Sequence, residues 1–150
     1  MAELRNVIVF TLASGRYAVE IRWVREVVSL GFVTAVPTAP APIGGICNLH
    51  GSILPVLDVA SLLDDQPGVR GPIAPGPAPR QGDGALVVEA EGVTCALRVD
   101  QIDHVASLHE SGGTLYDAGG RPLVLLDPAR LVRRALELVA GAPEARPAGA

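Results

Sequence analysis

Apolar and polar residues alternate with a period of two in several short stretches, a pattern typical of strands with one buried face. In residues 16–21, Tyr17, Val19 and Ile21 alternate with more polar neighbours. Together with the apolar run at 7–12, this stretch predicts a β-hairpin. The chain is therefore expected to be mainly β. Further strand-like runs are found at residues 32–36, 43–49, 52–57, 85–92 and 93–99.

Three segments have patterns typical of helices. Residues 22–29 place valines and a tryptophan on one helical stripe and charged side chains on the other, which predicts a short helix. Asp58 is predicted to be the N-cap of a second short helix at 59–64. An Asp-Pro pair predicts the start of a C-terminal helix at 128–140, because proline fits the first helical position. The glycine- and proline-containing residues 141–150 are expected to form a frayed tail.

The chain also repeats part of its own sequence. Residues 23–30 resemble residues 101–108, and residues 52–63 resemble residues 121–132. Each half contains a hairpin, a short helical turn, strands and an Asp-capped helix, so we predict two similar small β-barrels. The interval between the paired segments is shorter in the second half. About one strand with its turn is therefore predicted to be missing within residues 108–123.

The predicted organisation is a single domain over residues 1–150. Residues 65–83 contain five prolines and four glycines, a composition typical of a surface linker. The predicted boundaries are subdomain 1 at about 7–64, the linker at 65–83, subdomain 2 at about 84–132, the C-terminal helix at 128–140 and the tail at 141–150.

Composition narrows the classes of function. The net charge is −4, and all twelve basic residues are arginine. The absence of lysine excludes P-loop nucleotide enzymes and Schiff-base enzymes, since both need a lysine nitrogen. An acidic chain also lacks the positive surface of a nucleic-acid-binding barrel. No signal peptide is expected, because Glu3 and Arg5 are followed by only a short apolar run. No transmembrane helix is expected either, because prolines and glycines interrupt the uncharged stretch 27–57.

The cluster of Cys47, His50 and Asp58 is a candidate nucleophilic site. In a strand, however, Cys47 and His50 point to opposite faces. The three histidines fit no familiar zinc or iron spacing, and Cys47 and Cys95 are expected to be buried thiols in a reducing cytoplasm. We therefore expect a surface with Cys47 inward and His50 outward, and no catalytic residue, metal or cofactor. A small Cys/His-dependent enzyme is the alternative of a different class.

The order of these features resembles the CheW family of bacterial chemotaxis coupling proteins. The resemblance covers residues 7 to about 132, and the segment 43–58 is its most specific part. It implies two SH3-like five-stranded β-barrel subdomains, the second one truncated, with short helices, a C-terminal helix and a groove between the barrels. The segments that carry it are "FTLASGRYAVEIRWVREVV", "AVPTAPAPIGGICNLHGSILPVLDVASLL", "VTCALRVDQIDHVASL" and "RPLVLLDPARLV".

The resemblance implies a non-catalytic cytoplasmic adaptor at receptor arrays. Such a protein links the cytoplasmic tip of a methyl-accepting chemoreceptor to a CheA-type histidine kinase, without direct membrane contact of its own. For the four valines among its receptor-contact positions, packing in the core is the competing interpretation. The positions that match the family's receptor contacts are Val24, Glu26, Val27, Gly45, Asn48, His50, Gly51, Val99, Val105 and Leu108.

Two departures from the family pattern change these expectations. His50 stands where the family has arginine, and because histidine titrates near neutral pH and reaches less far, the receptor preference is expected to differ. The shortened segment 108–123 falls in the half that the family uses for its main kinase contact, so direct kinase binding is expected to be weakened or lost. The alternative is a competitive regulator that occupies receptors without recruiting kinase. A barrel edge left open by the missing strand would also permit a homodimer.

Overall fold

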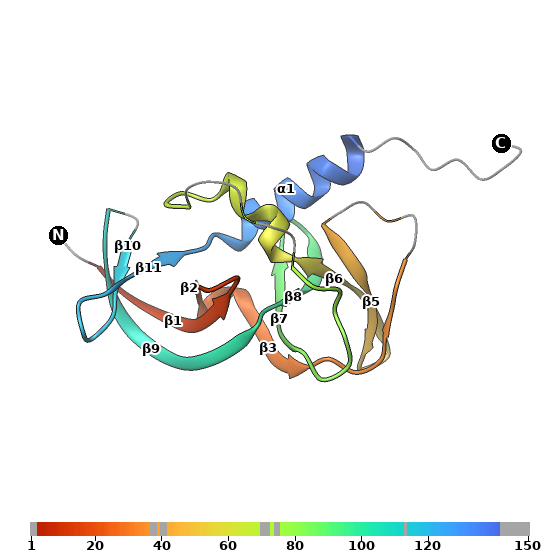
Figure 1. Ribbon diagram of the computed structural model, residues 1–150, viewed down its shortest axis with the longest axis horizontal. Helices are drawn as coiled ribbons and strands as arrows, with labels where there is room; N and C mark the ends of the chain where they lie inside the picture. Colours follow the sequence, from red (N-terminus) through yellow and green to blue (C-terminus); the bar gives the residue numbers. More distant parts are fainter. Residues whose placement is uncertain are drawn as a thin grey trace, which may run out of the picture.

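Figure 1 shows a β-barrel on the left and a second β-sheet on the right, with a C-terminal helix above them. The computed structural model describes residues 3–36, 39, 42–69, 73, 76–112 and 114–141. Among these residues, no helix combines the length and the hydropathy that are needed to cross a bilayer. The mainly β architecture with its C-terminal helix confirms the predicted fold class. The predicted tail lies outside the described residues from position 142 onward.

Five strands close the barrel in the order β1, β2, β11, β10, β9 and back to β1. Neighbouring strands are antiparallel, except that β2 and β11 pair in parallel. All five strands contribute an apolar side chain to one core, which fills the interior of the barrel. The strands are β1 (Glu3–Leu12), β2 (Gly15–Glu20), β9 (Gln101–Ser111), β10 (Thr114–Tyr116) and β11 (Pro122–Leu125).

Six strands form the second sheet in the order β3, β7, β8, β6, β5, β4. The pairing of β6 with β8 is parallel, and the other pairs are antiparallel. A short 3-10 helix, η1 (Ile21–Trp23), connects the barrel to this sheet, and a second one, η2 (Val59–Asp65), follows β6. The strands are β3 (Val24–Ser29), β4 (Val33–Thr34), β5 (Ile43–Leu49), β6 (Ser52–Asp58), β7 (Gly84–Ala90) and β8 (Val93–Arg98).

The largest apolar cluster, which we call the central core, joins the barrel to the second sheet. Successive side chains of a strand point to opposite faces, so β1 and β7 each contribute side chains to two apolar clusters. Val7 of β1 lies inside the barrel, whereas Ile8 belongs to the central core. Central-core residues include Ile8, Phe10 and Val19 from the barrel, Leu57, Leu86 and Leu97 from the second sheet, Leu62 from η2, and Leu131 and Val132 from α1 (Pro128–Gly141).

A buried glutamine fixes the start of α1. The Gln66 side chain accepts a hydrogen bond from the Asp127 backbone nitrogen at 2.8 Å and donates one to the Asp127 carbonyl at 3.2 Å. Gln66 is the one polar residue in the buried class among the described residues. Since both polar ends of its amide are satisfied, its burial is compatible with a stable core. The amide therefore ties the beginning of the helix to the segment that follows η2.

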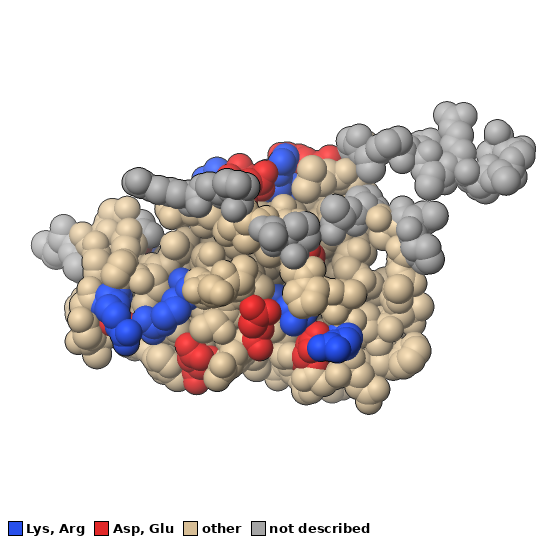
Figure 2. Space-filling view, viewed as in Figure 1, with Lys and Arg blue, Asp and Glu red and all other residues tan. Residues whose placement is uncertain are grey.

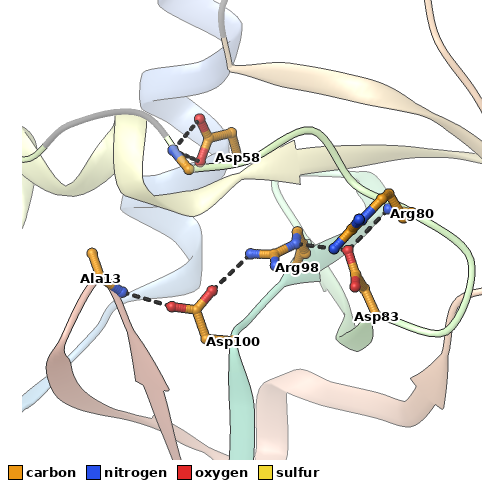
Figure 3. Close-up of polar contacts among 7 residues, drawn as sticks. Ala13, Asp58, Arg80, Asp83, Arg98 and Asp100 are labelled. Atoms are coloured by element: carbon orange, nitrogen blue, oxygen red, sulfur yellow. Dashed lines mark hydrogen bonds and ion pairs between the residues drawn. The ribbon is translucent and has the colours of Figure 1, made fainter.

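A polar network centred on Arg98 joins the two units (Figure 3). Its guanidinium donates to Asp83 at 3.0 Å and to Asp100 at 2.9 Å. Asp100 also accepts a hydrogen bond from the backbone nitrogen of Ala13, in the turn between β1 and β2. Ala13 and Ser14 both have positive φ angles, of 51° and 66°, which are unfavourable for residues other than glycine. The network thus anchors a strained hairpin of the barrel to the end of β8.

The two sheets do not correspond to the two consecutive stretches of sequence that were predicted as subdomains. The barrel combines β1 and β2 with β9, β10 and β11, and the second sheet contains everything from β3 to β8. The boundaries at 7–64 and 84–132 therefore do not separate the two sheets. The physical reason is the length of β1, which pairs with β2 on one side and with β9 along nearly its full length on the other. The N-terminal hairpin is thereby drawn into the barrel of the C-terminal strands.

The predicted helix at 22–29 is wrong, because only Ile21–Trp23 is helical and Val24–Ser29 is strand β3. Its β-branched valines suit a strand, and in the pairing with β7 alternate side chains are half-buried while those between them are exposed. The second short helix is present as η2, but the Asp58 side chain does not cap it. The Asp58 carboxylate instead accepts a hydrogen bond from the backbone nitrogen of Gly76 at 3.1 Å. Asp58 therefore holds part of the predicted linker against the sheet.

The shortened segment does not leave the barrel open. Strands β10 and β11 are only three and four residues long, yet they complete the ring between β9 and β2. Asp117 stabilises their connection, because its carboxylate accepts hydrogen bonds from the backbone nitrogens of Gly119 and Arg121, each at 2.9 Å. The Arg16 guanidinium donates to the same carboxylate at 2.8 Å. The barrel edge on which the expectation of a homodimer depended is therefore closed.

These contacts make the stability of the barrel sensitive to acid. The hydrogen bond from Arg16 and those from the backbone lower the pKa of Asp117 to about 2. Because this pKa lies below that of an unfolded aspartate, about 3.9, ionised Asp117 stabilises the fold above pH ~4 and loses that effect as the pH falls toward 2. We expect Asp117→Asn to flatten the pH dependence of the unfolding free energy in this window, measured by urea denaturation. Asp103→Asn, at an exposed position of β9, is the matched control. An unchanged slope in Asp117→Asn would contradict this account.

The central core predicts a large asymmetry between two leucines. Leu86 is fully buried in β7, whereas Leu4 of β1 is 60% exposed. Leu86→Ala should lower the free energy of unfolding by about 2–5 kcal/mol, since it leaves a cavity. Leu4→Ala should change it by less than about 0.5 kcal/mol. Equal losses in a chemical denaturation experiment would show that the central core is not the main source of stability.

Candidate binding surface

Two of the predicted contact residues are part of the core. Val99 belongs to the central core, and Leu108 points into the barrel interior. Both side chains are buried. Burial therefore favours the core interpretation of Val99 and places Leu108 behind the barrel wall, where a partner does not reach it.

Gly45 has a packing role in β5. A Cβ atom at this position would lie 2.8 Å from Val33 Cγ1 and 2.9 Å from the carbonyl oxygen of Thr34. Real Cβ atoms do not approach other atoms so closely, so a side chain at Gly45 would push β4 away from β5. The register between β5 and β6 also shifts at this point, which is typical of a β-bulge. The glycine thus allows β4 to lie against β5.

Three predicted residues shape the hairpin between β5 and β6. His50 and Gly51 have φ angles of 52° and 86°, as the two central residues of a tight hairpin turn of type I′ require. The side chain of Asn48 accepts a hydrogen bond from the backbone nitrogen of Gly51 at 3.0 Å. Glycine adopts a positive φ without strain, whereas histidine does so at a cost. The turn therefore fixes the direction in which the Cα–Cβ bond of His50 leaves the backbone.

His50 contacts Glu26 of β3. The Nε2 atom of the imidazole lies 3.0 Å and 3.1 Å from the two carboxylate oxygens of Glu26. The side chains are 72% and 41% exposed, respectively, so the pair lies at the surface. In the order of the sheet, β3 and β5 are separated by three strands, so the sheet must curl to bring the two residues together. The contact between the two side chains thus connects β3 with the turn that follows β5.

The outward orientation of His50 and the inward orientation of Cys47 are confirmed. Burial raises the pKa of the Cys47 thiol, and it raises that of Cys95 to about 12. A thiol nucleophile needs a lowered pKa or a neighbouring base. The imidazole of His50 contacts Glu26 instead of Cys47. The local geometry therefore does not favour the alternative of a Cys/His-dependent enzyme. Among the described residues, no group of three or more His, Cys, Asp or Glu side chains is arranged to hold a metal ion.

An apolar hollow that the sequence did not predict lies on the outer face of the barrel, and we call it the barrel groove. Leu4 of β1, Ile21 of η1 and Val105 of β9 line it and are 60%, 38% and 64% exposed. Its volume is about 480 Å³. Val105 pairs across the strands with Ile8, a central-core residue, which places Val105 on the outer face of the barrel. The other lining residues are Arg5, Asn6, Glu20 and Arg22.

The charges of the barrel groove compensate one another. Arg5 contacts Glu110 at 2.7 Å and Glu20 at 3.6 Å. Arg22 contacts Glu20 at 3.2 Å, and its guanidinium lies over the Trp23 ring at 5.0 Å from the centroid. Figure 2 likewise shows basic and acidic groups interspersed on a largely uncharged face. With its ions paired, the groove offers its exposed apolar side chains as the main means of contact.

The strand register separates Val24 and Val27 from Glu26. Val24 and Val27 pair with Val88 and Leu86 of β7, which belong to the central core, so both valines lie on the face toward the barrel. Val24 packs against that core, whereas Val27 is exposed. Glu26 pairs with Val87 of β7, which belongs to a smaller apolar cluster within the second sheet, so Glu26 lies on the opposite face. The predicted surface therefore has two parts, an apolar one at the barrel and a polar one at the Glu26–His50 pair.

Sequence reasoning missed Leu4, Ile21 and Arg22. Ile21 continues the alternation of β2, which predicts a place on the buried face of the strand. The strand ends at Glu20, however, and η1 exposes the isoleucine. Leu4 precedes the predicted first strand, which starts at Val7, whereas β1 begins at Glu3. The sequence carries little signal for this extension, because Leu4, Asn6 and Ile8 share one face of the strand and the polar Asn6 interrupts its apolar series.

Comparison with known proteins identifies relatives over most of the chain. The family described as the CheW-like domain matches residues 6–136. A probable chemotaxis protein CheW of Rhizobium etli is 36% identical over 63 residues, and the alignment spans 42% of this chain and 41% of that protein. The crystal structure of the scaffolding protein TtCheW from Thermoanaerobacter tengcongensis superposes with a TM-score of 0.65 over 86% of this chain and 92% of that one. At 23% sequence identity, this last likeness shows a common fold.

The burial of the two cysteines predicts low thiol reactivity. Because both thiols are buried and have raised pKa values, we expect Ellman's reagent at pH 8 to modify the native protein far more slowly than the urea-unfolded protein. Cys47, the less buried of the two, should react before Cys95. Single variants, Cys47→Ser and Cys95→Ser, separate the two rates. Rapid modification of native Cys47 would restore the nucleophilic interpretation of the hairpin.

Proposed function

Because the chain belongs to the family of CheW-like domains, we propose that it is a non-catalytic adaptor of a bacterial chemosensory system. In this proposal it works in the cytoplasm at receptor arrays and binds the signalling tip of a methyl-accepting chemoreceptor. The family match over residues 6–136 supports the class of protein. The barrel groove supports the receptor as the partner, because an apolar groove suits the apolar face of a helix.

The observation that carries the proposal is the exposure of Leu4, Ile21 and Val105 around one hollow. Scattered apolar side chains are common on protein surfaces, but a group of them that lines one concave surface indicates a binding site. The tip of a chemoreceptor is a helical hairpin, whose apolar residues recur on one face at positions i, i+3, i+4 and i+7. Val27 and the Glu26–His50 pair extend the proposed contact beyond the groove.

We further propose that direct binding to the histidine kinase is weakened. The support is the brevity of β10 and β11, at three and four residues, in the half that the family uses for its main kinase contact. The barrel is closed, so the weakening would come from a smaller contact surface and not from an exposed edge. If kinase binding is absent altogether, the protein is a competitive regulator that occupies receptors.

A charge in the groove tests the receptor site. Val105→Asp places a carboxylate on the apolar wall, and burying it under a helix would cost enough to weaken binding to a receptor-tip fragment at least ~10-fold. Ile53→Asp is the matched control, because Ile53 is also strongly exposed on a strand but lies outside the groove. Both variants should unfold like the wild type, since neither residue is buried. Binding is measured by isothermal titration calorimetry.

The same titrations separate the possible outcomes. Equal affinities of wild type and Val105→Asp would remove the barrel groove from the receptor site. A parallel titration with the regulatory domain of the kinase, using another CheW-like protein as reference, tests the second proposal. Kinase affinity equal to that of the reference would contradict the weakened contact.

A further inference from the structure

The Glu26–His50 pair fixes which nitrogen of the imidazole faces outward. An ionised carboxylate only accepts hydrogen bonds. Because Nε2 of His50 lies 3.0 Å and 3.1 Å from the two carboxylate oxygens, the hydrogen of the neutral ring must be on Nε2. The other ring nitrogen, Nδ1, then carries a lone pair. Since the side chain is 72% exposed, this second nitrogen is the part of the pair that a partner can contact.

Protonation reverses the character of this nitrogen. In the neutral ring Nδ1 accepts a hydrogen bond, and in the imidazolium it donates one, while Nε2 keeps its bond to Glu26 in both states. Histidine side chains exchange their proton in the physiological pH range. The contact of Nε2 with the Glu26 carboxylate is available in both states, so the ring need not reorient when the proton is added. The surface thus offers an acceptor at high pH and a donor at low pH.

The surroundings leave Glu26 as the charge that acts on His50. On β3, the neighbouring Arg25 is paired with Glu89 of β7 at 3.0 Å. Strand β5 contains no charged residue, and on β6 the one charged residue is Asp58, at the far end from the turn. Of the charged groups in the described part of the chain, Glu26 is the one that contacts the ring. The charged group in contact with the ring is therefore an anion.

We propose that His50 is a proton-dependent specificity residue of the partner surface. Its Nδ1–H donates to a carboxylate or carbonyl oxygen of the receptor tip when the ring is protonated, and this bond is absent when the ring is neutral. Binding to the receptor therefore tightens as the pH falls from 8 to 6. An arginine at this position donates at every pH, so the histidine makes conditional a contact that an arginine makes permanently. This inference depends on the proposed receptor-binding function.

The test is a set of titrations of a receptor-tip fragment at pH 8 and pH 6. Exposed charge-assisted contacts contribute modestly, so wild-type affinity should rise about two- to five-fold at the lower pH. His50→Arg should bind equally at both values, with the affinity of the wild type at pH 6. His50→Gln should also be independent of pH and bind like the wild type at pH 8. His104→Gln, at an exposed histidine of β9, should keep the wild-type dependence and so controls for titration elsewhere.

Each outcome decides the inference. If His50→Gln keeps the wild-type pH dependence, or if the wild type binds equally at both pH values, the inference is overturned and the receptor-binding function stands. If the wild type binds the fragment at neither pH, the proposed function itself fails. NMR of the ring nitrogens adds a readout without the partner, in which the hydrogen of the neutral ring should be found on Nε2, as the contact with Glu26 requires. A neutral ring with its hydrogen on Nδ1 would show that the pair does not form in solution.

Discussion

The central core is the constraint on which the rest of the structure depends. It is built from the outer face of the barrel, one face of the second sheet, η2 and α1, so segments from both ends of the chain must meet there. The N-terminal hairpin meets this requirement while it pairs with the C-terminal strands instead of with its sequence neighbours. The same requirement is met by the alternation of β1 and β7, whose successive side chains fill two different cores.

The proposed binding surface is a consequence of the same arrangement. Strands β1 and β9 extend beyond the central core, so the outer barrel face continues from buried Ile8 to exposed Leu4 and Val105. The groove is therefore the part of that apolar face which the second sheet leaves uncovered. On the opposite face of β3, Glu26 contacts His50 in the turn after β5, because the second sheet curls. The apolar and polar parts of the surface thus have separate structural origins.

Local patterns in the sequence predicted much of the fold but not its pairing. The hairpin around Ala13, the C-terminal helix and the orientations of Cys47 and His50 follow from alternation, capping and turn chemistry. The helix expected at 22–29 failed because its apolar spacing fits both a helical stripe and an edge strand, and pairing with β7 decides between them. The barrel groove and the Glu26–His50 contact depend on residues far apart in the chain, which no local pattern brings together.

The most direct measurement is NMR mapping of a receptor-tip fragment on the isotope-labelled protein. The account predicts that the largest chemical-shift changes occur at Leu4, Ile21 and Val105, with smaller changes at His50 and little change at Ile53 and Tyr116. Changes concentrated on Ile53 or Tyr116, with the groove residues unaffected, would contradict the claim that the uncovered barrel face is the receptor site.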